Sequence, residues 1–385
     1  MFRALWRSLP AVVLAGAGAL AGWRVLAPAE VLDQATAPYP APAARAPGVT
    51  GRTNAAPLIV DDRIRVYAAK RQVRADGPVD GKTVYTALWS FRRWPQQVAG
   101  VVAIGPTVIS RWSDGELVAI DGRTGTIAWR ARGPSAPGFA GHRTGASTVW
   151  GPAGLHVAGG TVVVTGGGRL AAYEGSTGAR RWTAAVPAGC TDGFTTSGGR
   201  YVCPTRAYDV ATGTPVPGPP GPLTPLGCEV AASSCAGFRD GTGRGWLAGD
   251  ATPRPLTALD RPGSTVVAGL VAAPGTGGSL EITDPGSGRV VGRFPAGAQV
   301  LGASAAGRLV LLGADRTLQL IDPRTGATEA SFPLAVEREK LTWTPGRWQV
   351  TDSYAAIERL TTGGPADPDA PDYYFTVQTV IIAAV

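Results

Sequence analysis

The stretch Ala119-Ile120-Asp121-Gly122-Arg123-Thr124-Gly125-Thr126-Ile127-Ala128-Trp129 contains the pattern that decides the fold of this chain of 385 residues. An acidic residue, two variable residues, Thr or Ser and then Gly lie between two alternating apolar runs. The acidic side chain can accept hydrogen bonds from backbone NH groups of its own turn, and Gly supplies the positive φ that a tight hairpin requires. The stretch therefore predicts a β-hairpin.

The same turn recurs along the chain at intervals of 53, 35, 75 and 38 residues. Its first residues are Asp121, Glu174, Asp209, Asp284 and Asp322. The interval of 75 is close to two periods, which predicts a degenerate copy around Asp250. A single hairpin cannot bury its own apolar face, so the copies must stack or close into a ring.

Composition agrees with an all-β chain. Fifty-four Gly and 33 Pro residues fall between short β-patterned runs, and charged residues make up only 17%. The net charge of +8 comes from scattered Arg residues without a basic run or a nucleic-acid motif, so no nucleic-acid partner is predicted.

The N-terminus reads as an export signal. Residues 1–7 carry Arg3 and Arg7 and form a cytoplasmic n-region, and residues 8–28 are largely apolar with Arg24 inside. We interpret residues 8–28 as a signal anchor, that is, a transmembrane helix of a single-pass cell-membrane protein whose bulk is extracytoplasmic. A signal peptide cleaved near Ala27-Pro28-Ala29 and a buried helix are the alternatives. Residues 29–57 are rich in Ala and Pro and predict a linker, followed by the repeat domain at 58–385.

The four cysteines are Cys190, Cys203, Cys228 and Cys235. An even count in an exported chain indicates disulfides, and three pairings are possible. Pairing of near neighbours, Cys190 with Cys203 and Cys228 with Cys235, is the simplest choice. Zinc is disfavoured because no CxxC occurs and the two His residues lie upstream.

Two copies read Ala119-x-Asp121-x-x-Thr124-Gly125-x-x-x-Trp129 and Ala172-x-Glu174-x-x-Thr177-Gly178-x-x-x-Trp182. This pattern resembles the tryptophan-docking repeat of PQQ-like (quinoprotein-type) β-propellers. The resemblance implies four-stranded blades in which Trp129 and Trp182 pack on the neighbouring blade. The copies at Asp209, Asp284 and Asp322 keep the turn but lack the Trp.

About seven blades are predicted, within a range of six to eight. Candidate units begin near Val98, Gly141, Ala184, Pro225, Gly263, Gly297 and Leu341. The strand at 83–90 is expected to complete the last unit, because closure with strands from both ends removes the exposed edges.

The function predicted from the sequence is a membrane-anchored extracytoplasmic scaffold that binds an unknown protein or a cell-envelope component. The resemblance extends to the propeller lipoprotein that assists outer-membrane β-barrel assembly, although this chain has no lipobox Cys. No catalytic, cofactor-binding or metal-binding residue is predicted, so the chain is expected not to be an enzyme and to carry no cofactor.

Two alternatives remain open. One is a PQQ-dependent oxidoreductase, as in the family's enzymes, which use the quinone with calcium. The other is a carbohydrate-binding propeller in which exposed Trp112, Trp150 or Trp246 would stack on sugars.

Overall fold

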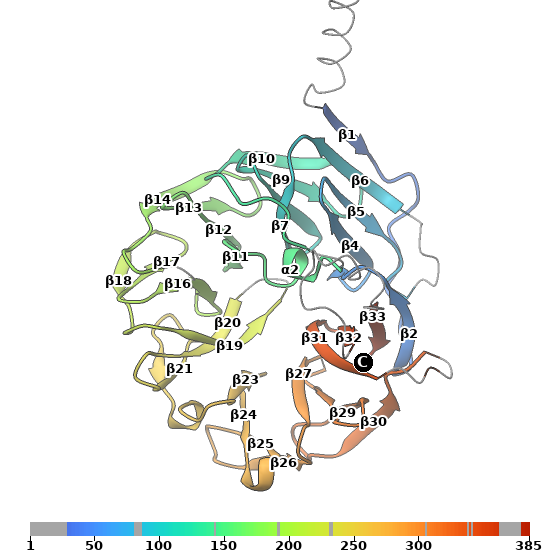
Figure 1. Cartoon of the computed structure of the whole chain (residues 1–385), viewed down its shortest axis with the longest axis vertical. Coiled ribbons are helices and arrows are strands. Elements are labelled where there is room, and N and C mark those ends of the chain that lie inside the picture. Colours follow the sequence, from blue (N-terminus) through green and yellow to red (C-terminus); the bar gives the residue numbers. More distant parts are fainter. Residues whose placement is uncertain are drawn as a thin grey trace, which may run out of the picture.

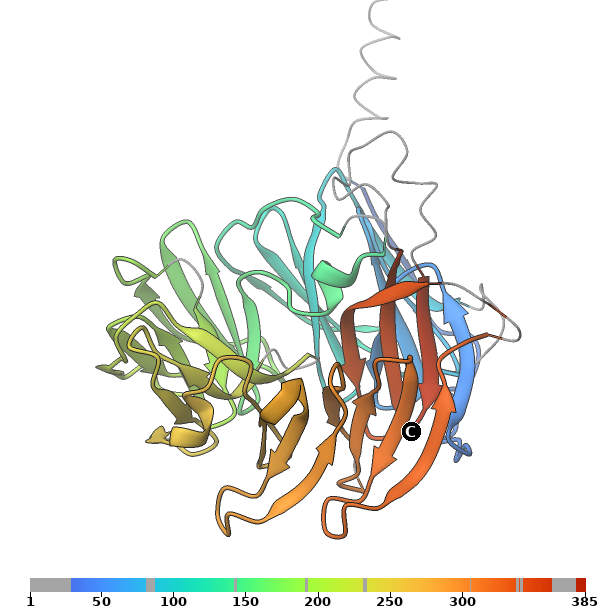
Figure 2. The same cartoon turned by 60° about the horizontal axis from the view of Figure 1, so that its bottom comes forward.

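The repeated hairpins form a ring of β-sheets around a central axis in the computed structural model (Figures 1 and 2). The structure describes residues 29–80, 87–141, 144–190, 193–230, 234–304, 306–336, 339, 342–361 and 379–385. Helix in these ranges is limited to α2 (Ala146–Val149) and the 3-10 turns η1 (Thr257–Leu259) and η2 (Thr276–Gly278). The chain is thus an all-β propeller, as predicted.

Within the described ranges the strands form seven sheets, most of them four-stranded. Blade 1 contains β3 (Leu58–Val60), β4 (Ile64–Ala69), β5 (Gln72–Asp76), β6 (Ala87–Trp94) and the added β1 (Ala29–Asp33); blade 2 contains β7 (Val98–Ile104), β8 (Thr107–Trp112), β9 (Glu116–Asp121) and β10 (Ile127–Arg132); blade 3 contains β11 (Leu155–Ala158), β12 (Thr161–Gly166), β13 (Arg169–Glu174) and β14 (Arg180–Ala185). Blade 4 contains β15 (Phe194–Thr196), β16 (Arg200–Cys203), β17 (Arg206–Asp209) and β18 (Pro215–Pro217); blade 5 contains β19 (Thr224–Glu229), β20 (Ser234–Arg239), β21 (Gly245–Leu247) and β22 (Arg254–Pro255); blade 6 contains β23 (Thr265–Val267), β24 (Leu270–Pro274), β25 (Leu280–Thr283) and β26 (Val290–Phe294). Blade 7 contains β27 (Gln299–Ala303), β28 (Leu309–Leu312), β29 (Thr317–Ile321) and β30 (Thr328–Pro333), and blade 8 contains β31 (Trp343–Val350), β32 (Tyr354–Thr361), β33 (Thr379–Ala384) and β2 (Gly48–Thr53).

The described strands make eight blades, at the upper end of the predicted range. One sheet holds two of them, because β15 pairs in parallel with β20 and so joins the fourth blade to the fifth. Asp250 lies between β21 and β22, the third and fourth strands of blade 5. The degenerate copy predicted there therefore occupies the same place in its blade as the intact turns.

The ring closes differently from the sequence prediction. The strand expected at 83–90 does not complete the last unit: its described part begins β6, which pairs with β5 and β1 in blade 1, and residues 81–86 lie outside the described ranges. Closure is made by β2, which pairs with β33 of blade 8. Residues 29–57, predicted as a linker, therefore contain two strands of the propeller. As an outer strand with half-exposed residues, β2 needs no apolar alternation, so its sequence gives no strand signal.

Tryptophan docking joins the first four blades. The indole Nε1 atoms of Trp89, Trp129 and Trp182 each donate a hydrogen bond of 2.9 Å to the carbonyl of the second residue of the next blade's turn. The acceptors are Gly122, Gly175 and Val210.

The Gly that ends each of these turns leaves room for the indole ring of the docking Trp. A Cβ atom on Gly125 would lie 2.5 Å from Trp89, and one on Gly178 2.5 Å from Trp129. At Gly213 the distance to Trp182 would be 2.6 Å. The turn glycines are needed for the close approach of a ring as well as for their positive φ.

One later pair of blades uses a different donor to the same acceptor position. In the contact between blades 6 and 7, Arg289 donates through Nη2 to the Pro323 carbonyl (3.0 Å) and through Nη1 to that of Arg324 (2.9 Å). Pro323 is the second residue of its turn, so the acceptor position is the same. The turn acids Asp284 and Asp322 accept bonds from the backbone NH groups of Gly286 and Arg324, as the sequence predicts.

Both predicted disulfides are confirmed. Cys190–Cys203 ties the connection that precedes blade 4 to β16, and Cys228–Cys235 joins paired positions of β19 and β20. The first closes the longer loop and is worth about 3 kcal/mol in the chain-entropy model.

The predicted n-region at 1–7 and the signal anchor at 8–28 lie outside the described residues. Of the helices in the part of the chain that the structure describes, none has the length and apolar character to cross a bilayer.

Gly178→Ala should destabilise the fold more than Gly288→Ala. Both glycines have a φ of 71°, so each substitution carries the same backbone strain, but only the Cβ at Gly178 meets a Trp ring, and nothing lies within 4 Å at Gly288. The difference in free energy of unfolding, measured by denaturant titration, should be about 1–3 kcal/mol, the usual cost of overpacking. Equal losses would show that the Trp129 contact does not stabilise the ring.

Candidate functional site

The connection between blades 2 and 3 reaches into the middle of the ring. It carries α2, which lies near the centre of the ring in Figure 1 and packs against β4 and β7. Trp150, only 2% exposed, donates its indole NH to the Pro57 carbonyl at 2.9 Å. The Ala56 NH donates to the Thr144 carbonyl. This connection fills part of the central channel.

Blade 8 holds the same connection from the other side. The buried carboxylate of Glu358 accepts hydrogen bonds from the Thr144 hydroxyl (2.5 Å) and the Arg347 NH (3.2 Å). Arg347 in turn donates through Nη1 to the Trp150 carbonyl at 2.7 Å. The segment is thus fixed at both ends and forms a rigid wall of the channel.

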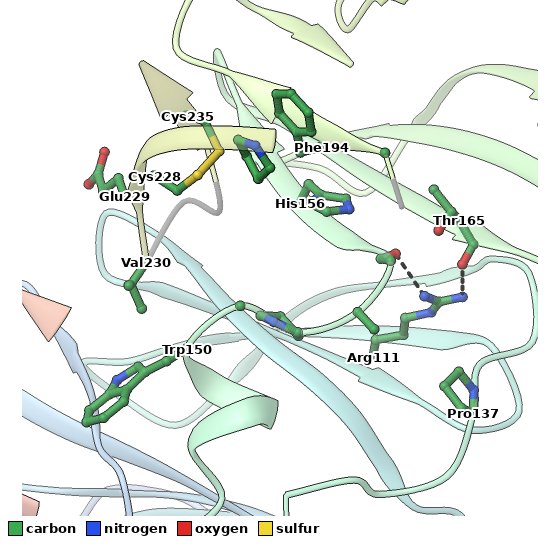
Figure 3. Close-up of a pocket in the computed structure, with 16 residues that line it drawn as sticks. Arg111, Pro137, Trp150, His156, Thr165, Phe194, Cys228, Glu229, Val230 and Cys235 are labelled. Atoms are coloured by element: carbon green, nitrogen blue, oxygen red, sulfur yellow. Dashed lines mark hydrogen bonds between the residues drawn. A yellow bond between two sulfur atoms is a disulfide. The ribbon is translucent and has the colours of Figure 1, made fainter. Parts of the chain in front are cut away.

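A cavity of about 550 Å³ lies beside this wall (Figure 3). Its lining includes Trp150, His156 of β11, Phe194 of β15 and the Cys228–Cys235 disulfide. The volume is in the range of small-molecule and peptide side-chain sites, about 300–1,000 Å³.

Arg111 lines this first cavity, but its guanidinium group is engaged in hydrogen bonds with backbone carbonyls of the cavity wall. Its side chain is fully buried, and its Nη1 and Nη2 atoms donate to the carbonyls of Gly154 (2.8 Å) and Thr165 (2.7 Å). Further bonds of 3.2 Å reach the carbonyls of Pro134 and Ser135. Burial lowers its pKa to about 10, so the guanidinium stays charged at neutral pH. It cross-links blade 2 to the connection and to β12.

A second cavity, of about 510 Å³, continues the channel on the side of blades 5 to 8. It shares Cys228, Glu229 and Val230 with the first. Its walls come largely from the innermost strands and present polar and apolar surface in about equal measure, with Trp348 of β31 among the lining residues. The Trp348 indole NH donates to the Leu301 carbonyl at 2.7 Å, which fixes the plane of the ring.

Carboxylates give the second cavity its charge. Glu229, at the end of β19, and Asp352, in the turn after β31, both line it. Burial raises the pKa of Glu229, and the negative charge of Asp352 raises it further. In blade 1, burial raises the pKa of Asp62, with a smaller contribution from Asp352. This end of the channel is acidic although the chain as a whole is basic.

Of the residues singled out in the sequence, Trp150, Cys228 and Cys235 line the first cavity, whereas the repeat-motif residues lie outside both cavities. Among the described residues, Trp129 and Trp182 lie between blades, and the turn acids lie at the ends of third strands. Arg111, Glu229, Trp348 and Asp352 belong to no motif. Only the three-dimensional arrangement of inner strands brings Glu229 near Asp352.

The tryptophans considered for sugar stacking serve the fold. Trp112 is fully buried and donates to the Ser110 hydroxyl at 3.0 Å, and Trp150 is buried as described above. Trp246 stacks on Phe238 and donates to the Asp240 carboxylate at 2.7 Å. Trp112 and Trp150 therefore present no face to a sugar.

Among the described residues that line the two cavities, Arg111 is the only Lys or Arg that an anionic quinone would meet. The quinone is an anion, whereas the second cavity presents two carboxylates, and Arg111 in the first cavity is engaged with four carbonyl groups. In the described ranges no group of three or more His, Cys, Asp or Glu side chains is arranged to hold a metal ion.

Comparison with protein families gives one match. A family model described as "Outer membrane protein assembly factor BamB" matches residues 46–149 and 113–294. No curated protein sequence matches the chain.

Several solved structures match the chain at low sequence identity. The C-terminal WD40 domain of Sif2 matches with a TM-score of 0.50 at 12% identity, covering 88% of this chain and 98% of that chain. BamB from Moraxella catarrhalis matches with a TM-score of 0.42 at 15% identity, covering 87% and 100%. A europium-containing methanol dehydrogenase matches with 0.43 at 15% identity, covering 88% and 92%. The Sif2 likeness supports the propeller fold and nothing further.

Glu229→Gln should raise the midpoint of thermal unfolding at about pH 8 and leave it unchanged at about pH 3. The pKa of Glu229 is raised in the folded state, so its ionised form destabilises the fold above that pKa, whereas below the unfolded-state pKa the carboxyl and the amide are both neutral. Glu281→Gln is the control, because Glu281 pairs with Arg293 at 2.7 Å and should show no gain. A lower midpoint for Glu229→Gln at about pH 8 would contradict the proposed environment of Glu229.

Proposed function

The chain belongs to the PQQ-type repeat family described as outer membrane protein assembly factor BamB, and from this premise we propose that it is a scaffold outside the cytoplasm that binds a protein partner through its channel. Residues 8–28 would anchor it in the cell membrane, with the propeller on the outer side. The name of the family model describes an assembly factor, which is a role in protein interaction.

One observation carries the proposal: several side chains in and around the two cavities are hydrogen-bonded to the fold and hold a preformed concave surface. Arg111 cross-links the first cavity, Glu358 and Arg347 fix the connection beside it, and Trp348 is tied to Leu301. A rigid surface can bind a partner without the cost of ordering its own side chains. Such a surface suits binding better than it suits a reaction, which requires acids, bases or nucleophiles directed at the substrate.

Two disulfides support a position outside the cytoplasm. Cys190–Cys203 and Cys228–Cys235 account for all four cysteines of the sequence. Disulfides persist in oxidising compartments and are rare in the cytosol. The predicted export signal and this pairing favour the same location.

Photocrosslinking in cells should reveal a partner at the channel. A photoreactive residue placed at Ala303, which lines the second cavity, should give one protein adduct of defined mass in the full-length chain. The matched position is Glu329 on the outermost strand β30, which is exposed and should not give that adduct. Protease added to intact spheroplasts should degrade the adduct, because the propeller lies outside. Adducts of the same kind from both positions, or an adduct protected from protease, would refute the scaffold or its location.

The quinone-dependent oxidoreductase remains the alternative, and reconstitution distinguishes it. Addition of PQQ and Ca²⁺ to the purified propeller should neither raise its melting temperature nor support dye reduction with alcohols or aldoses, because the acidic channel repels an anionic cofactor. A Ca²⁺-dependent rise in melting temperature together with turnover would make the chain an enzyme. The carbohydrate-binding alternative has no support from Trp112 or Trp150, which are buried.

A further inference from the structure

The second cavity combines aliphatic and acidic side chains. Its walls include the aliphatic side chains of Val266 of β23, Val300 of β27 and Val350 of β31. Its charged groups are the carboxylates Glu229 and Asp352. None of the 36 Lys and Arg residues is among the described residues that line it, so no basic side chain of the lining pairs with these carboxylates.

We propose that this cavity receives the cationic side chain, Arg or Lys, of an extended segment of the partner protein. The inference rests on the proposed function and specifies the chemistry of the partner. The long methylene stem of Arg or Lys can lie along apolar walls while its charged end reaches a carboxylate. A cavity of about 510 Å³ with aliphatic side chains in its walls and two carboxylates provides both surfaces.

Electrostatics selects the sign of the occupant. Glu229 and Asp352 line the same cavity, and Asp62 is bonded to Thr351, the residue that precedes Asp352, so three carboxylates lie at this end of the channel. The Asp62 carboxylate accepts a hydrogen bond from Thr351, which holds the turns of blades 1 and 8 together. A cation that enters relieves the repulsion, whereas an anion adds to it.

Trp348 adds a third element of recognition. Its ring lines the same cavity as both carboxylates, and the hydrogen bond to the Leu301 carbonyl keeps it in one orientation. An ammonium or guanidinium group over a Trp face gains cation–π attraction in addition to the ion pair. The combination favours an organic cation over a hydrated metal ion.

The first cavity differs from the second in its charged groups. It shares Glu229 but also contains Arg111, and in Figure 3 the Glu229 side chain points away from Arg111 and His156, on the far side of the disulfide. The carboxylate therefore belongs to the second cavity in its electrostatic effect. The proposed cation site is at that end of the channel.

Isothermal titration with matched peptides tests the proposal. The probes are acetyl-Ala-Ala-Arg-Ala-Ala-amide and the same peptide with citrulline, which has the shape of Arg without its charge. The wild-type propeller should bind the Arg peptide at least about tenfold more tightly, since one ion pair of about 1.4 kcal/mol gives that factor. Glu229→Gln and Asp352→Asn should each reduce this preference, and Glu281→Gln, on β25, should leave it unchanged.

Two outcomes overturn the inference. One is equal affinity for the Arg and citrulline peptides, or a preference that survives the double substitution at Glu229 and Asp352. The other is binding of free butylguanidine as tightly as the Arg peptide, which would make the site one for a small cation. A protein adduct from Ala303 that persists in Glu229→Gln would leave the scaffold function standing while the cation site fails, so the two proposals are separable.

Discussion

The hydrogen bond between a fourth-strand indole and a turn carbonyl of the next blade is the contact on which the ring depends. Blades of a propeller share few backbone hydrogen bonds with their neighbours, so their angular spacing must come from side chains. Here Trp89, Trp129 and Trp182 repeat one contact at one length, and a Gly without a Cβ makes room for each ring. Arg289 makes an equivalent contact to the second turn residue of blade 7 with different chemistry. What these contacts share is therefore the acceptor, the carbonyl of the second turn residue, and Trp is one of two side chains that donate to it.

The sequence predicts those parts of the structure whose contacts join residues close together in the chain. The turn acids and glycines report a hairpin because their bonds lie within five residues, and the spacing from Asp121 to Trp129 identifies the docking strand. Blade 1 was missed because no copy of the turn introduces Trp89. The closing strand β2 was taken as part of a linker, because its pairing with β33 spans most of the chain and leaves no local pattern.

The binding surface was harder to predict than the fold for the same reason. Glu229 and Asp352 lie more than a hundred residues apart and belong to different blades, and each looks like a solvated acid in its own segment. Their role becomes visible only in the second cavity, which both side chains line and which brings two like charges together. Arg111 is the opposite case. It reads as one of many Arg residues in a basic chain, yet it is fully buried and donates to four carbonyls. A net charge of +8 thus gives no sign that the described lining of one cavity holds two carboxylates and no Lys or Arg.

The position of β33 between β32 and β2 sets the order in which the chain can fold. Most blades are continuous in sequence, so each can form from local contacts soon after its residues are synthesised. Blade 8 cannot, because β2 must wait for β33; the Thr50 hydroxyl reaches the Ile382 carbonyl across 332 residues. Until then, the ring is an open arc, and blade 1 exposes the apolar sheet face that later packs against blade 8. A chain exported in an extended form would therefore close its ring only after translocation through Ala384, and this apolar face would be unprotected during that interval.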